Sequence, residues 1–85
     1  MKILLEKIKK LEHLEKIADE AETRYTEEPE NTELESAFDK AYKAEFDKYI
    51  ECANYIVNCT GGKVSFNRAK YLINVKREEL KRLVE

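Results

Sequence analysis

The feature that most limits how this chain can fold is its shortage of residues that turn a backbone. Two glycines and one proline occur in 85 residues. A sheet of many strands needs frequent turns, whereas a few long helices need only two or three breaks. Apolar residues make up 42% of the chain and charged residues 40%, which suits helices with one buried and one solvated face. The composition therefore predicts an all-α fold in a single domain, residues 1–85.

Apolar side chains recur at spacings of three and four in three stretches, as helices with one apolar face require. The first stretch predicts a helix over residues 2–26. Pro29 ends this pattern, because proline lacks a backbone N–H and disfavours helical geometry in the residue before it. Thr32, followed three residues later by Glu35, is typical of a capping box in which each side chain accepts from a backbone N–H. The second helix is therefore predicted over residues 33–59.

Two adjacent glycines, Gly61 and Gly62, mark the end of the second helix, because glycine adopts the left-handed conformation that closes a helix C-terminus. Ser65 is the expected N-cap of a third helix over residues 66–84. The resulting prediction is a three-helix bundle: a long antiparallel helical hairpin with a shorter third helix.

The predicted helix lengths imply an elongated molecule. A second helix of some 26 residues is roughly 39 Å long, whereas a compact chain of this size is about 30 Å across. The third helix, at roughly 29 Å, is too short to cover the whole hairpin. Part of the apolar surface of the hairpin is therefore left without an intramolecular partner, and we expect self-association.

The densest apolar feature of the sequence is a set of aromatic residues at helical spacing in the second helix. Four of them, Phe38, Tyr42, Phe46 and Tyr49, are predicted to form the interface for a second copy or for a helix of another protein. Tyrosine suits an interface that stays partly wet. The alternative is that these rings simply pack in the core of the monomer.

Charge is unevenly distributed along the chain. The net charge is +2 over residues 1–14, −8 over residues 15–60 and +4 over residues 61–85. Charged faces are usually solvated, and the basic ends can also neutralise the acidic middle within one molecule. These ordinary roles account for the pattern without a charged ligand.

The basic last helix nevertheless supports a second hypothesis, nucleic-acid binding. A glycine turn before a basic helix resembles the arrangement of a helix-turn-helix, whose second helix places its first residues on base edges. In this alternative Asn67, Arg68, Lys70 and Arg77 contact the nucleic acid. The preceding helix is much longer than in that motif, and the net charge of −2 gives no general attraction for phosphates, so this remains the alternative.

Nothing in the sequence predicts an enzyme. His13 is the one histidine, and lysines and an isoleucine occupy the positions three and four residues away, so no carboxylate faces it on its own helix. Gly61 and Gly62 lack the upstream glycine and the strand of a phosphate-binding loop. We therefore expect no catalytic site, no cofactor and no metal.

The two cysteines, Cys52 and Cys59, are seven residues apart in one predicted helix and cannot bond to each other there. They are interpreted as two small apolar side chains in a reducing compartment. No apolar run approaches the length of a signal-peptide core or a membrane span. The sequence therefore favours a cytoplasmic protein without a membrane partner.

Overall fold

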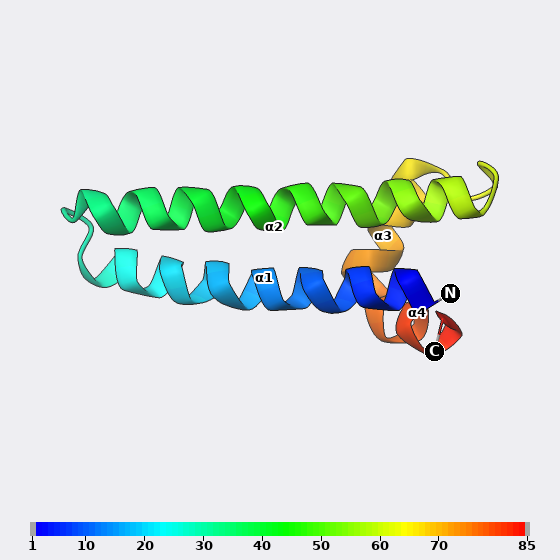
Figure 1. Cartoon of the computed structure of the whole chain (residues 1–85), viewed down its shortest axis with the longest axis horizontal. Helices are drawn as coiled ribbons and strands as arrows, with labels where there is room; N and C mark the ends of the chain where they lie inside the picture. The colour runs from blue at the N-terminus through cyan, green and yellow to red at the C-terminus, as the bar shows by residue number, and fades with distance from the viewer. Residues whose placement is uncertain (1, 85) are drawn as a thin grey trace.

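The computed structural model describes residues 2–84, with side chains through Arg82. This part of the chain forms helices α1 (Lys2–Glu27), α2 (Thr32–Cys59), α3 (Phe66–Val75) and α4 (Arg77–Val84). Helices α1 and α2 form a long antiparallel hairpin, and α3 and α4 lie at one end of it (Figure 1). The molecule measures 46 × 21 × 19 Å, and its radius of gyration is 14.9 Å against about 12 Å for a compact chain of this length. The predicted elongated all-α fold is confirmed.

The single third helix predicted over residues 66–84 is wrong, because the chain bends at Lys76. Helix α3 ends there, and the Lys76 carbonyl accepts from the backbone N–H of Leu80 to begin α4. The preceding Ile73, Asn74 and Val75 are weak helix formers, and the acidic residues that open α4 suit a helix start. The bend lets α3 pack on α2 while α4 reaches α1.

The capping box predicted at the start of the second helix is also wrong, because Thr32 is not the N-cap. Asn31, one position earlier than expected, is the N-cap of α2, and its side-chain oxygen accepts from the backbone N–H groups of Glu33 and Leu34. Thr32 is thereby the first residue of the helix. Asparagine is at least as good an N-cap as threonine, so it can take this role in the turn that follows Pro29.

The glycine turn after α2 and the cap of α3 are as predicted. Gly61 and Gly62 have φ values of 60° and 85°, and their N–H groups donate to the carbonyls of Asn58 and Val57. This pair of bonds is a Schellman motif, which satisfies two carbonyls at the helix end. Ser65 then accepts from the backbone N–H of Arg68 at 3.1 Å.

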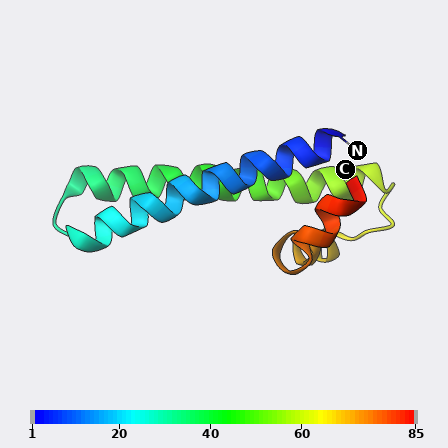
Figure 2. The ribbon, with the colours of Figure 1, turned by 90° about the horizontal axis from the view of Figure 1, so that it is seen from below.

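The hydrophobic core occupies only one end of the hairpin. We call residues 2–15 and 48–84 the packed end, and residues 16–47 the arm. In the packed end, α1, α2 and the α3–α4 unit bring together Leu4, Ile8, Leu11, Cys52, Ala53, Ile56, Ala69, Ile73 and Leu80. The arm is two helices alone, as the view from below shows (Figure 2). All arm residues are described by the structure, and among them Ala18 is the one buried side chain.

The two cysteines differ in burial. Cys52 is buried in the core, which raises the pKa of its thiol to about 11, whereas Cys59 is exposed near the end of α2. Cys52 is thus buried as a small apolar side chain would be, whereas Cys59 is not. Among helices α1 to α4 as described, none has a segment long and apolar enough to cross a membrane.

Candidate interaction surface

The four aromatic residues predicted as an interface lie along α2, and we call them the aromatic surface: Phe38, Tyr42, Phe46 and Tyr49. Tyr42 is 57% exposed and Phe46 is 51% exposed, while the other two rings are half-buried. The Phe38 and Tyr42 rings meet edge to face at 6.2 Å between centroids, and the Phe46 and Tyr49 rings are 6.4 Å apart. The four rings thus form two pairs along α2, and in each pair one ring is more than half exposed. The alternative prediction was that all four rings pack in the core of the monomer. Tyr42 and Phe46 do not, because about half of each side chain is exposed.

Each end of the aromatic surface is fixed by another helix. Toward the hairpin turn, Phe38 stacks on Tyr25 of α1 with 6.0 Å between ring centroids. Toward the packed end, the Tyr49 hydroxyl accepts from Asn74 Nδ2 of α3 at 2.8 Å. Of the four rings, those of Tyr42 and Phe46 lie between these two contacts and are more than half exposed. The aromatic surface therefore begins where α3 ends and continues along the arm.

A groove beside these rings carries acidic side chains from both hairpin helices. It is lined by Glu15 of α1, Asn74 of α3, and Tyr42, Glu45, Phe46 and Tyr49 of α2. Partial burial raises the pKa of Glu45, and the carboxylates of Glu15 and Asp19 raise it further. The groove therefore combines the aromatic rings of α2 with a carboxylate from each hairpin helix.

In the packed end, the same edge of α1 is neutralised by α4. The Arg77 guanidinium donates two hydrogen bonds to the Glu15 carboxylate, one of them 3.0 Å long from Nη2, and Lys81 Nζ lies 3.2 Å from Glu12 Oε1. Arg77 Nε also donates to the Ile73 carbonyl at the end of α3. Basic side chains of α4 thus face the acidic edge of α1. Beyond Glu15, that edge continues into the arm with Asp19.

The four residues of the nucleic-acid hypothesis do not lie together on one helix. Asn67, Arg68 and Lys70 belong to α3, whereas Arg77 belongs to α4 and faces α1 through its pair with Glu15. The Arg68 guanidinium lies 4.9 Å from the centre of the Tyr71 ring, and the Lys70 ammonium lies 5.1 Å from the centre of the Phe66 ring. The predicted nucleic-acid surface is therefore reduced to α3.

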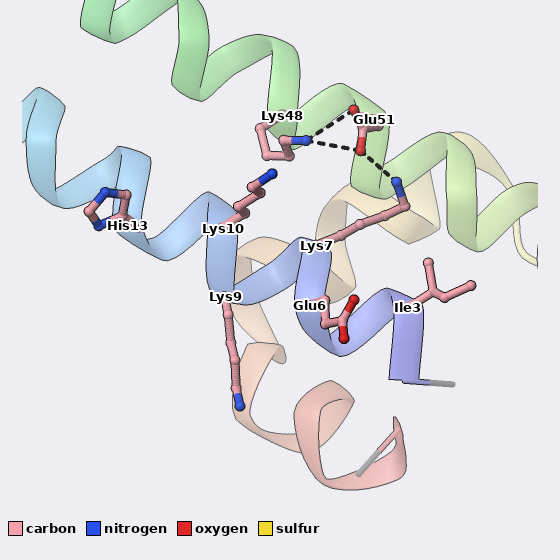
Figure 3. A pocket seen from close by; sticks show the side chains of 8 residues that line it. All are labelled: Ile3, Glu6, Lys7, Lys9, Lys10, His13, Lys48 and Glu51. Atoms are coloured by element: carbon pink, nitrogen blue, oxygen red, sulfur yellow. Dashed lines mark hydrogen bonds and ion pairs between the residues drawn. The ribbon is translucent and has the colours of Figure 1, made fainter.

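A second groove, at the packed end, carries four lysines. It is lined by Ile3, Glu6, Lys7, Lys9, Lys10, His13, Lys48 and Glu51. Glu51 lies between two of these lysines, at 2.6 Å from Lys7 Nζ and 3.1 Å from Lys48 Nζ (Figure 3). Lys10 extends toward Lys48, and His13 points away from Glu51 (Figure 3). The hydrogen bond that Lys7 donates to Glu51 raises the pKa of Lys7, and this ion pair joins α1 to α2.

The structure places the one histidine at the surface and Cys52 in the core. His13 is exposed, and no group of three His, Cys, Asp or Glu side chains is placed to hold a metal ion within residues 2–82. The high pKa of Cys52 keeps its thiol protonated, and a protonated thiol is a poor nucleophile.

The sequence predicted four aromatic residues at helical spacing on α2, but it did not predict which residues of the other helices lie beside them. Asn74 was not a candidate, because its contact with Tyr49 depends on where α3 meets α2. The acidic edge formed by Glu15, Asp19 and Glu45 was visible only as general negative charge. Comparison with models of protein families, with curated protein sequences and with solved structures finds no match to this chain.

Proposed function

We propose that this protein is a non-catalytic helical interaction module that binds another polypeptide along its aromatic surface. The observation that carries this proposal is the exposure of Tyr42 and Phe46 on a two-helix arm that lacks a third layer. Burying the exposed half of one such ring removes roughly 100 Å² of apolar area from water and contributes about 2 kcal/mol. Tyrosine and phenylalanine are also enriched at the centres of protein interfaces.

The partner in this proposal is a helix, either of a second copy or of another protein. A helix suits the arm because two packed helices present a groove, and a third helix in that groove completes a bundle. No cofactor or metal takes part. The free thiols of Cys52 and Cys59 are typical of a reducing compartment, so we place this function in the cytoplasm.

Photo-crosslinking in the native host tests the proposal. A photoreactive phenylalanine analogue replaces Phe46, and in a matched control it replaces Ala44, which is exposed two residues away on the opposite side of α2. We expect a crosslinked product from position 46 and little from position 44. Equal products from both positions, or none from position 46, would contradict an interface at the aromatic surface.

The nucleic-acid hypothesis is tested separately with Arg68→Ala and Lys70→Ala, since Arg77→Ala would also break a structural ion pair. If the chain binds nucleic acid through α3, these changes abolish a salt-dependent gel shift. If it is the interaction module proposed above, no such shift occurs and the crosslinks from position 46 are unchanged.

A further inference from the structure

We propose that the polypeptide bound on the aromatic surface is a second copy of this chain, and that each copy places the outer face of its α3 on the arm of the other. This proposal rests on the proposed function and names its partner. The two copies then form a closed pair in which each α3–α4 unit supplies the third layer that the partner's arm lacks.

The first argument is the exposed apolar residues. Six large hydrophobic side chains are exposed in the described part of the chain: Ile3, Ile17, Tyr42, Phe46, Tyr71 and Val75. Two of them, Tyr42 and Phe46, belong to the aromatic surface on α2, and two others, Tyr71 (41% exposed) and Val75 (61% exposed), lie on α3. One reciprocal contact between α3 and the arm covers four of these six side chains. Exposed aromatic residues gathered on two separate faces are typical of surfaces that are buried in an assembly.

The second argument is charge. The segment that contains α3 and α4 has a net charge of +4, and residues 15–60 have a net charge of −8. Two arms packed on each other would bring the carboxylates of Asp19 and Glu45 toward the same groups of the partner, and like charges repel. An α3 that carries Arg68 and Lys70 brings opposite charge to that edge instead. Within one molecule, Arg77 and Lys81 already show basic residues of this segment pairing with the acidic edge of α1.

The third argument is size. The uncovered part of α1 runs from Lys16 to Glu27 and is about 18 Å long, and α3, with 10 residues, is about 15 Å long. The α3–α4 unit lies on one side of the hairpin at the end where both chain termini are found (Figure 2). Two antiparallel copies can therefore place their two units end to end between the hairpins. A specific interface buries about 800 Å² per partner, roughly an eighth of the 6068 Å² of one copy.

The symmetry of this pairing determines how many copies the assembly contains. Each copy contributes one arm and one α3, so the contact occurs twice and the assembly closes as a dimer. A filament would require one contact without its reciprocal. The expected species in solution therefore has twice the 10.0 kDa mass of the chain.

Sedimentation of three proteins provides the first test: the wild type, an α3 variant (Tyr71→Ser with Val75→Ser) and an arm variant (Tyr42→Ser with Phe46→Ser). All four side chains are exposed, so circular dichroism should show unchanged helicity. We expect each double variant to raise the dissociation constant of the dimer at least tenfold. An equimolar mixture of the two variants should dimerise more strongly than either alone, because the mixed pair keeps one contact intact. Ile17→Ser, in a different groove with Ala21 and Leu34, is the control and should leave the constant unchanged.

An intermolecular distance measurement provides the second test. A spin label is attached through Asp39→Cys, which shares a helix face with Tyr42 and Phe46, in a Cys59→Ser background. The spin-labelled protein is mixed with ¹⁵N-labelled protein that carries no spin label. In the control, the spin label is attached through Ala44→Cys. We expect broadening of amide signals from residues 67–75 of the ¹⁵N copies, and little broadening with the control.

The outcomes separate this inference from the proposed function. Broadening confined to residues 38–49 would show arms packed on arms and overturn the inference while the aromatic surface remains the interface. A monomer throughout, together with crosslinks from position 46 to a different polypeptide, would also overturn the inference and leave the proposed function standing. A monomer without crosslinks from position 46 would overturn both.

Discussion

The packed end and the arm are built from the same two helices and differ in whether a third layer covers them. In the packed end Leu4, Ile8 and Leu11 are at most 1% exposed, because α3 and α4 close the space that two helices leave open. In the arm the equivalent positions, such as Tyr25 and Phe38, remain half-buried. Two helices touch along a narrow line, so a wide apolar face is buried only when a third element packs on it. The comparison shows that a helical apolar pattern does not by itself specify burial.

The electrostatics of the two regions differ for the same reason. In the packed end the carboxylates of Glu12, Glu15 and Glu51 each pair with a basic side chain. In the arm Glu45 faces other carboxylates, and its pKa is raised. These carboxylates of the packed end are therefore paired with cations, whereas the arm keeps a negative edge beside its exposed rings.

The largest expected difference between the two regions is in how far the free energy of unfolding falls when an isoleucine is replaced by alanine. Ile8 is fully buried, so Ile8→Ala should lower the free energy of unfolding by about 3 kcal/mol through lost packing and a residual cavity. Ile17 in the arm is 40% exposed, and Ile17→Ala should cost less than about 1 kcal/mol. Urea unfolding followed by circular dichroism, at concentrations low enough for the monomer, measures both. Equal costs would mean that the arm is as well packed as the other end.

A smaller effect is expected from the ion pair that attaches α4 to α1. Arg77→Ala removes two hydrogen bonds to Glu15 and one to the Ile73 carbonyl, and it should cost about 1–2 kcal/mol. A double-mutant cycle with Glu15→Gln isolates the coupling between the two side chains. The more exposed Lys7–Glu51 pair is the matched comparison, with an expected coupling below about 0.5 kcal/mol. A larger coupling for Lys7–Glu51 would place the main electrostatic link between α1 and α2 rather than at α4.

The smallest effect is expected from the acidic edge of the arm. Because the folded state raises the pKa of Glu45, the contribution of this group to stability is full below the ordinary value of 4.5 and is lost as the pH rises through the raised pKa. Glu45→Gln should therefore slightly raise the thermal midpoint at pH 7, and this gain should vanish below pH 4.5.

Glu51 in the packed end is the control for this prediction, because hydrogen bonds from Lys7 and Lys48 lower its pKa. The contribution of the Glu51 carboxylate to stability is present above pH 4.5 and is lost as the pH falls through the lowered pKa. Glu51→Gln should thus lower the midpoint at pH 7. A lower midpoint for Glu45→Gln at pH 7 would show that Glu45 has a favourable partner.

The helices were predictable where local rules suffice and less so where a helix end depends on its surroundings. The Schellman turn at Gly61 and Gly62 and the cap at Ser65 follow from residue type alone. The bend at Lys76 has no glycine or proline to mark it, and the local signs were the weak helix formers before it and the acidic residues that open α4. A Glu12 to Lys16 pair is favoured by helical spacing, yet Glu12 binds Lys81 because α4 crosses α1 there. Local spacing cannot reveal a competing partner that lies 69 residues away in the chain.

The sequence by itself determined the helical class, the long hairpin, the aromatic residues on one face of α2 and the separation of charge along the chain. These depend on residue spacing and composition, which act locally. Only the tertiary structure decided which part of that face is covered, because coverage depends on the bend at Lys76 and on the position of the α3–α4 unit. It also decided that Arg77 and Lys81 neutralise α1 near Glu15, whereas Glu45 remains beside other carboxylates. Burial and charge pairing join residues far apart in the chain, and local pattern carries no information on those distances.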